Sequence, residues 1–363
     1  MGIRGARLIA MSAWAGFLAL FAAAAPCLGQ IPKAQASAAT LAEYLRSRGF
    51  SASDLRALER GEAVTRILKA EIVAANNTAE VAVEGAVRVD VPSRVFIEAV
   101  ADVTAFRNQG MVRFGIIGAS PQASDFEGIS LPARDALEMK ACRPGRCGLK
   151  LTREDIEEFR SKVDGRRSDF NRQVDLFARE KLLGVMKAYV REGASAFPAL
   201  DDKPTAVSLK EQLDGLLRNT PELLTYYPEI HDYVRDYPRH PLAGSRNVFY
   251  WSLIDFGLKP TLRLTHVVDY VPCDTNDVVV LWAQLYASHY FNGGLGVTVH
   301  RSEGARSYVV QLDRFRADDL GGLFGGVKRG RMARAMRSSL QTFLRATGAD
   351  LKARAKRDAA SIQ

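Results

Sequence analysis

Polar side chains with the chemistry of acids, bases and hydrogen-bonding groups interrupt apolar runs in the last third of the chain. They are Arg263, His266, Asp269, Gln284, His289, His300 and Arg314. Alternation along an extended strand places His266 on the same face as Leu264 and Tyr270. An imidazole in such apolar surroundings serves as a general acid, a general base or an anchor for a ligand. The alternative is a core histidine held by a satisfied hydrogen bond.

A second group of such residues lies at the end of the next strand, in the run from Tyr286 to Phe291. Strand ends often line the mouth of a cavity. There, Tyr286 and His289 would bind a polar head group while Trp282 and Phe291 hold an apolar body. Ordinary aromatic packing with exposed polar tips is the alternative interpretation.

Neither a metal nor a cofactor is predicted, and no residue is assigned a catalytic role. Alternation does not force His266, His289 and His300 onto one face, and no His-x-His motif or carboxylate pair supports a metal site. The chain has no G-x-S-x-G, H-E-x-x-H, Walker or dinucleotide-binding motif. The glycine-rich run 321–326 lacks the spacing of a phosphate-binding loop, and we expect it to be a flexible lead into a helix.

These residues lie on four strand-like runs that lead into one amphipathic helix. The runs are Thr261–Val271, Val278–Ser288, Leu295–Arg301 and Ser307–Phe315. Short turns separate them, one at residues 292–294 (Asn-Gly-Gly), so neighbouring strands are expected to be antiparallel. In the helix, Met336, Leu340 and Phe343 recur at helical spacing among arginines. A curved sheet with this helix across it would enclose an interior, and we expect Met336 and Phe343 to line it.

Earlier parts of the chain supply further strands and a long helical stretch. The predicted strands are Ala63–Lys69, Glu80–Val91 and Met111–Ile117, with a bulge at Gly85 and a helix over Arg94–Phe106. Residues 120–246 have helical patterns and end in an aromatic tract, which is interpreted as a lid over the interior, a partner surface or plain core. The predicted fold is therefore α+β: a helix-grip, with a curved antiparallel sheet wrapped on a long C-terminal helix and a helical insertion.

The sequence divides into six segments on these grounds. They are 1–29, a signal peptide; 30–62, an N-terminal helical segment; 63–119, the first part of the sheet domain; 120–246, the helical insertion; 247–349, the second part with the C-terminal helix; and 350–363, a basic tail.

The first residues have the pattern of a secretory signal peptide, because Arg4 and Arg7 precede the apolar run 8–25. We expect cleavage after Gly29; the alternatives are an uncleaved membrane anchor and a lipoprotein anchored through Cys27. The mature protein is thus expected to be secreted or periplasmic. Cys142 and Cys147 flank an Arg-Pro-Gly-Arg turn and are expected to form a disulfide, whereas Cys273 is expected to be a free, partly buried thiol.

The chain of 363 residues carries a formal charge of +9, which falls to about +7 without the signal peptide. Nucleic acid is excluded as a partner, since an exported protein without basic-aromatic motifs has no basis for binding it. The positive charge is concentrated in the C-terminal helix. This pattern is typical of a solvated helix face, or of a helix that contacts an anionic membrane surface.

The order of elements resembles a known superfamily. Glu80–Phe106 reads as a strand that runs into Val-Pro-Ser-Arg-Val-Phe (91–96) and a helix that ends in Asp-Val-Thr-Ala-Phe (102–106). This is similar to the first strand and helix of the START/Bet v 1-like superfamily, which includes polyketide cyclases, and the last strands and helix are similar in order to the helix-grip remainder. The long insertion and Phe96 in the first helix depart from the usual pattern. The resemblance implies a hydrophobic ligand cavity between the sheet and the C-terminal helix.

Three functions follow as hypotheses. The leading one is non-catalytic binding or transport of a lipid or other hydrophobic small molecule. The others are a polyketide cyclase-like enzyme that uses His266, Asp269 or His289 as acid and base, and an interaction module with a filled interior. The residues expected to line the cavity are His266, Tyr270, Trp282, Gln284, Tyr286, His289, Phe291, Met336 and Phe343.

Overall fold

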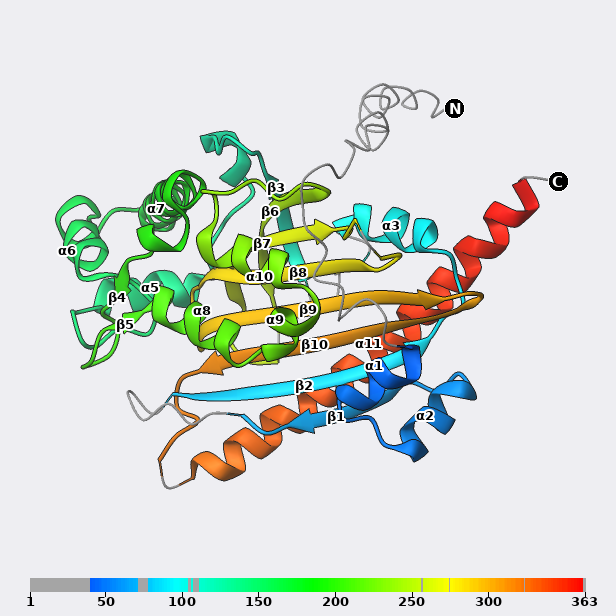
Figure 1. Ribbon diagram of the computed structural model, residues 1–363. Helices are drawn as coiled ribbons and strands as arrows, with labels where there is room; N and C mark the ends of the chain where they lie inside the picture. Colours follow the sequence, from blue (N-terminus) through cyan, green and yellow to red (C-terminus); the bar gives the residue numbers. More distant parts are fainter. Residues whose placement is uncertain are drawn as a thin grey trace, which may run out of the picture.

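The computed structural model describes residues 40–361 except 71–77, 104–105, 107–110, 256, 274 and 323. The expected signal peptide and Cys27 lie outside the described residues. Eight strands form one antiparallel sheet, ordered β1-β2-β10-β9-β8-β7-β6-β3 from edge to edge (Figure 1). Their bounds are β1 (Val64–Leu68), β2 (Ala79–Arg88), β3 (Met111–Ile117), β6 (Ser245–Ile254), β7 (Thr261–Tyr270), β8 (Val278–Ala287), β9 (Phe291–Glu303) and β10 (Arg306–Ala317). The predicted α+β fold with a large antiparallel sheet is confirmed.

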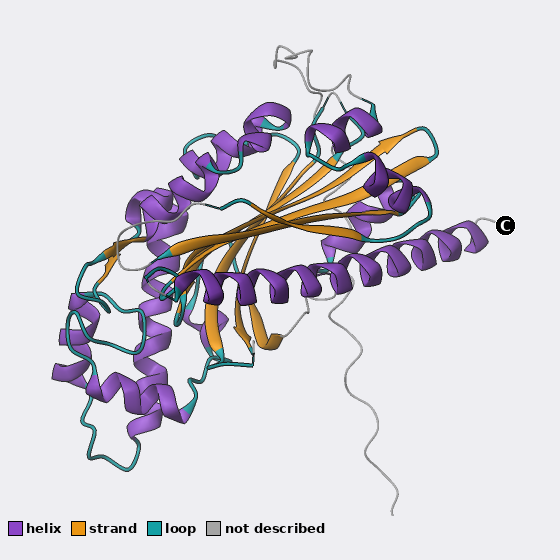
Figure 2. Ribbon diagram, turned by 90° about the horizontal axis from the view of Figure 1, so that it is seen from below, coloured by secondary structure: helices purple, strands orange, loops and turns teal. Residues whose placement is uncertain are grey.

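One long helix, α11 (Gly325–Ser361), runs along one face of the sheet, and α3 (Ser93–Ala101) lies on the same side (Figure 2). Leu340 and Leu344 of α11 pack in one cluster with Val83, Val87 and Val280 of the sheet. The predicted helix across a curved sheet is therefore present. It starts within the glycine-rich run and continues past residue 350, so the segment expected as a basic tail is helical up to Ser361.

A glycine sets the distance between α11 and the sheet. A Cβ atom at Gly85 of β2 would lie 2.7 Å from Leu344 Cδ1. The register of β2 continues without a shift through Gly85 against both β1 and β10. The predicted bulge at this position is wrong: the glycine is needed because the helix approaches the strand closely.

The helical insertion covers the opposite face of the sheet. Leu264, Leu281 and Val297 of the central strands pack in one cluster with Tyr189 and Leu216 of the insertion. Its elements are η2 (Ala123–Phe126), α5 (Ala133–Ala141), α6 (Arg153–Lys162), α7 (Phe170–Glu192), η3 (Gly193–Ala196), the short strands β4 (Ala199–Leu200) and β5 (Val207–Ser208), α8 (Leu209–Arg218), α9 (Pro221–Tyr226) and α10 (Pro228–Asp236). The N-terminal helices α1 (Leu41–Ser47) and α2 (Ala52–Glu59) pack on this sheet near its β1 end. The sheet is thus covered on both faces.

Most of the aromatic tract at the end of the insertion packs in the core under the insertion. Its buried members there are Tyr227, Tyr233, Tyr237, Phe249 and Trp251, whereas Tyr250 is buried in the core on the α11 side. Since the insertion and α11 lie on opposite faces, the insertion is not a lid over the space between the sheet and α11. The last three of these residues form part of β6, a strand that the sequence pattern did not predict.

The connection between β8 and β9 also differs from the prediction. The Asn-Gly-Gly run at 292–294 lies inside β9, paired with β10, and the chain turns at residues 288–290 instead. Tyr290 takes a positive φ of 59° there, which is uncommon for a residue other than glycine.

The described part of the chain, residues 40–361 without the gaps given above, contains no helix that is long and apolar enough to cross a membrane.

Candidate functional site

The nine residues predicted to line a cavity divide between the two faces of the sheet. His266, Tyr270 and Tyr286 belong to or pack against the core under the insertion. Those on the α11 side are Trp282, Gln284, Phe291, Met336 and Phe343. His289 lies in the turn after β8, beside α5. The register of β7 against β8 explains this division. His266 pairs with Ala283, and paired residues point to the same face of the sheet. Even-numbered residues of β7 therefore point to one face, and even-numbered residues in most of β8 point to the other.

His266 is a core histidine with both ring nitrogens occupied. Its Nδ1 lies 2.8 Å from Tyr189 Oη, and its Nε2 lies 2.7 Å from Asn247 Oδ1. Burial lowers the pKa of His266 to about 3. The neutral ring therefore donates to Asn247 and accepts from Tyr189 at neutral pH. It has no nitrogen left for a substrate.

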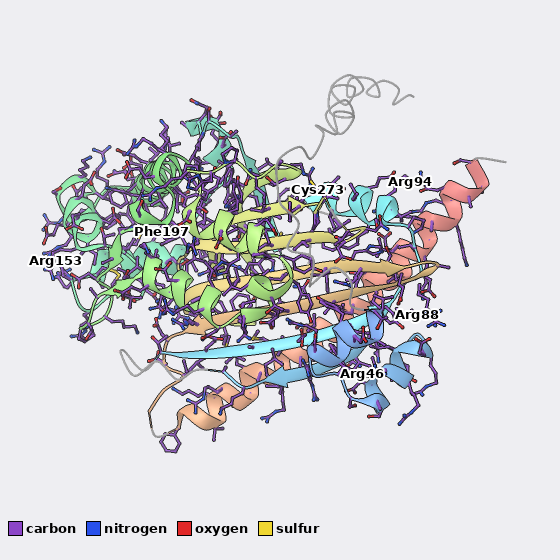
Figure 3. All side chains as sticks on the ribbon, in the orientation of Figure 1. Arg46, Arg88, Arg94, Arg153, Phe197 and Cys273 are labelled. Atoms are coloured by element: carbon purple, nitrogen blue, oxygen red, sulfur yellow. A yellow bond between two sulfur atoms is a disulfide. The ribbon has the colours of Figure 1, made fainter. Side chains whose placement is uncertain are left out.

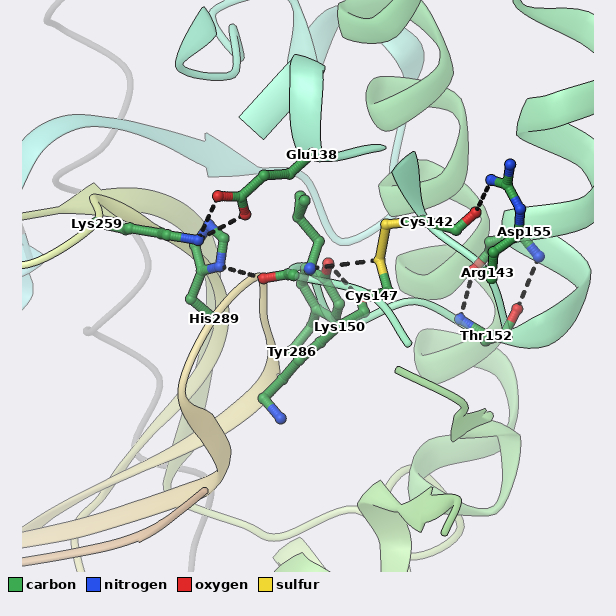
Figure 4. Close-up of a disulfide and its surroundings, with 12 residues drawn as sticks. Glu138, Cys142, Arg143, Cys147, Lys150, Thr152, Asp155, Lys259, Tyr286 and His289 are labelled. Atoms are coloured by element: carbon green, nitrogen blue, oxygen red, sulfur yellow. Dashed lines mark hydrogen bonds and ion pairs between the residues drawn. A yellow bond between two sulfur atoms is a disulfide. The ribbon is translucent and has the colours of Figure 1, made fainter. Parts of the chain in front are cut away.

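His289 makes two hydrogen bonds to the insertion and lies beside Lys259 and Glu138, in the surroundings of the disulfide (Figure 4). Its Nδ1 faces Gly148 O at 2.9 Å and its Nε2 faces Asp135 Oδ2 at 3.0 Å. Both ring nitrogens therefore face an oxygen atom of the protein, one a backbone carbonyl and the other a carboxyl group. Next to it, Lys259 Nζ lies 2.6 Å from both carboxylate oxygens of Glu138. Burial raises the pKa of Glu138, but the hydrogen bonds and charge of Lys259 outweigh it, and the pKa falls below its usual value.

His300 is also held by the fold. Its Nε2 lies 3.1 Å from Val91 O, and its ring stacks on Phe96 with centroids 5.1 Å apart. Burial lowers the pKa of His300 to about 4. All three histidines of the late strands and turns are thus buried and bonded to neighbouring protein groups.

The α11 side of the sheet carries a different kind of group. Ser252, Thr265 and Gln284 lie on three neighbouring strands, and each is at most 5% exposed. We call these three residues the polar cluster. Thr265 pairs with Gln284 across β7 and β8, and Ser252 pairs with Arg263, two residues before Thr265. Ser252 Oγ, Thr265 Oγ1 and Gln284 Oε1 are buried without a hydrogen-bond partner. Such groups are rare in folded proteins, and each calls for an explanation.

An aromatic platform adjoins the polar cluster. We use this name for Trp282, Phe291 and Phe315, whose rings lie 5.3 Å (Trp282 to Phe315) and 5.2 Å (Phe291 to Phe315) apart. The guanidinium of Arg263 lies 5.2 Å from the Trp282 ring and 5.5 Å from the Phe315 ring. A Cβ atom at Gly296 would lie only 1.9 Å from Trp282 Nε1, so this glycine makes room for the indole. Met336 of α11 is half-buried against the platform.

The polar cluster is largely new relative to the sequence prediction, which named only Gln284. Ser252 lies on the unpredicted strand β6. Alternation along β7 places Thr265 with Arg263 on the face opposite His266, and this is the one local signal in the sequence that points to it. The pairing that brings the three residues together depends on strand register, which no single stretch of sequence specifies.

The predicted disulfide between Cys142 and Cys147 is present, with a Cα–Cα distance of 4.4 Å (Figure 4). Cys273, in the turn between β7 and β8, is exposed and also disulfide-bonded, so the prediction of a free, partly buried thiol is wrong. Figure 3 shows this residue on the same side of the molecule as Arg94 of α3. Disulfides indicate folding in an oxidising compartment.

A groove with a volume of about 620 Å³ lies beside the Cys142–Cys147 disulfide. Its wall includes Glu138, Arg143, Arg146, Asp202 and Lys203. Side chains of both charges therefore line the groove. Nearby, the buried Lys150 Nζ lies 2.5 Å from Asn292 Oδ1 and 2.6 Å from Asp318 Oδ2, which ties the insertion to the sheet.

In the part of the chain that the structure describes, no three His, Cys, Asp or Glu side chains are placed to hold a metal ion. A scan against protein-family models found no match to this chain. A search of curated proteins also found no match.

Proposed function

We propose that this protein binds a lipid or another hydrophobic small molecule outside the cytoplasm, between the sheet and α11, as a START/Bet v 1-like carrier. The observation that carries the proposal is the polar cluster beside the aromatic platform. Buried polar atoms without partners destabilise a filled core. They are well placed, however, for the polar end of a molecule whose apolar body lies on Trp282, Phe315 and Met336.

The state of the histidines favours binding without chemistry. An acid–base mechanism needs a group within hydrogen-bond reach of the substrate and with a pKa near the working pH. His266 and His300 are held neutral, and both nitrogens of His266 are occupied. His289 is committed to Asp135 and Gly148. A polyketide cyclase-like reaction through His266 or His289 is therefore the weaker hypothesis.

The first experiment is native mass spectrometry of the mature protein purified from the periplasm, followed by organic extraction and identification of any co-purified molecule. A bound lipid or apolar metabolite is the expected result. An empty protein that also fails to bind a fluorescent fatty-acid or sterol probe would contradict the carrier hypothesis and favour an interaction module.

A matched pair of variants locates the site. Met336→Gln introduces an amide beside the aromatic platform and is expected to weaken probe binding roughly tenfold, which corresponds to about 1.4 kcal/mol of lost apolar burial. Leu176→Gln, at a 51% exposed position in α7, is the control and is expected to leave binding unchanged. Equal affinities for the two variants would place the ligand elsewhere.

An anionic membrane is the proposed source of the ligand. Phe324 and Val327 at the start of α11 are 70% and 65% exposed. Lys328, Arg331 and Arg334 follow with exposed side chains, and no acidic residue precedes Asp350 in the helix. Apolar tips next to a basic helix face suit a surface of anionic head groups, where each cationic side chain contributes about 1 kcal/mol.

Co-sedimentation with vesicles tests this contact. Vesicles that contain phosphatidylglycerol are expected to bind the protein, and vesicles of phosphatidylcholine alone are not. The double substitution Phe324→Ser/Val327→Ser is expected to lower the bound fraction several-fold. Leu258→Ser, at another 65% exposed apolar position, is the control. Binding that ignores lipid charge and the double substitution would show that the basic face is merely solvated.

A further inference from the structure

We infer that the polar cluster is a head-group site that selects an apolar molecule carrying a neutral hydroxyl group. The inference rests on the proposed function and specifies its ligand. Its basis is that Ser252 Oγ, Thr265 Oγ1 and Gln284 Oε1 are buried on one face of three adjacent strands without a hydrogen-bond partner.

The three residues are neighbours on one face of the sheet. Thr265 and Gln284 are direct cross-strand neighbours, and side chains of such pairs lie about 5 Å apart at Cβ. Ser252 is a diagonal neighbour of Thr265, because Thr265 pairs with Tyr250. The other end of the Gln284 amide faces the backbone, since its Nε2 donates a long hydrogen bond to Phe291 O at 3.5 Å. That contact leaves Oε1 as the outward acceptor.

The chemistry of these atoms distinguishes between head groups. Gln284 Oε1 only accepts, so the ligand must supply a proton donor. The hydroxyls of Ser252 and Thr265 both donate and accept, so the same ligand group must also accept. A carboxylate has no proton to give to Gln284 at neutral pH. An ammonium group only donates, so it has no lone pair to accept from the hydroxyls of Ser252 and Thr265. A hydroxyl group meets both requirements without a charge.

Four probes of equal chain length test the selection: 1-dodecanol, 1-methoxydodecane, dodecanoic acid and dodecylamine. Their affinities are measured at pH 7.5 by displacement of an environment-sensitive dye. The alcohol is expected to bind tightest. The methyl ether keeps the oxygen acceptor and lacks the donor, so it is expected to bind roughly three- to tenfold more weakly.

Substitutions then assign the contacts. Gln284→Met keeps the length of the side chain and removes the acceptor, so it is expected to weaken binding of the alcohol three- to tenfold and to leave the ether unchanged. Thr265→Val is expected to weaken binding of the alcohol to the same extent. Thr298→Val is the matched control on the same face, because the hydroxyl of Thr298 already bonds to Gln311 Oε1. It is expected to lower the urea midpoint of the ligand-free protein without changing the preference for the alcohol, whereas Thr265→Val leaves the midpoint unchanged or higher.

The results distinguish an incorrect hydroxyl selection from an incorrect carrier function. Equal binding of alcohol and ether, with no effect of Gln284→Met, would overturn the hydroxyl selection and keep the carrier hypothesis. Tightest binding of the acid or the amine would also overturn it. Failure of all four probes to bind would overturn the proposed function itself, and this inference with it.

Discussion

The buried histidine of β7 makes a quantitative prediction about pH and stability. His266 has a pKa of about 3 in the folded protein, against an ordinary value of 6.5. Between these two values the unfolded chain binds a proton at this site and the folded protein does not. The free energy of unfolding therefore rises with pH in this window, and stability is lost as the pH falls below 6.5. At pH 5.0 the loss from this one residue is about 2 kcal/mol relative to pH 7.5.

This magnitude is set almost entirely by the unfolded chain. Any folded pKa well below 5 gives the same loss at pH 5.0, because the folded protein is then unprotonated throughout the measured range. His266→Gln removes the titration and keeps one donor and one acceptor for Tyr189 and Asn247. Urea unfolding of the wild-type protein between pH 7.5 and pH 5.0 should therefore show about 2 kcal/mol more loss of stability than the variant.

The control is His240→Gln, since His240 is an exposed residue after α10. It is expected to retain the wild-type pH dependence. Parallel curves for wild type and His266→Gln would refute the reasoning. They would mean that His266 takes up a proton in the folded protein, which would restore it as a candidate acid or base.

Two further predictions concern the covalent and steric supports of the fold. Replacement of both Cys142 and Cys147 by serine opens a loop with a sequence separation of 5, and is expected to lower the free energy of unfolding by about 2 kcal/mol in urea titrations. Gly296→Ala places a methyl group against Trp282 and is expected to cost about 1–3 kcal/mol, whereas Gly184→Ala in α7, where a Cβ meets nothing within 4 Å, is expected to gain up to about 1 kcal/mol by thermal unfolding.

The elements with strong periodicity could be predicted from the sequence. β7, β8 and β10, the long helix and the Cys142–Cys147 disulfide all follow from local patterns. Strand β6 could not be predicted in this way, because Phe249–Ile254 is buried on both faces of the sheet and its sequence shows no alternation of polar and apolar residues. The position of the Asn-Gly-Gly run within β9 was also unpredictable, since its pairing with β10 outweighs its local preference for a turn.

The candidate site was harder to predict because residues next to one another in sequence belong to different cores. Thr265 and His266 are adjacent, yet Thr265 points toward α11 and His266 toward Tyr189 of the insertion. The choice of face depends on which layer each helix covers. A sequence pattern shows that two faces exist and does not show which one is left for a ligand.

Because both faces of the sheet are covered, histidines and charged residues on its strands are poor markers of a functional site in this protein. Burial of a histidine or a charged group costs desolvation free energy, which hydrogen bonds to other protein groups must offset. Tyr189 and Asn247 provide these hydrogen bonds for His266. A hydroxyl costs less to bury, and it stays without a protein partner where another molecule supplies one. In this sheet the histidines therefore mark structure, and the less conspicuous Ser252 and Thr265 mark the site that a ligand would complete.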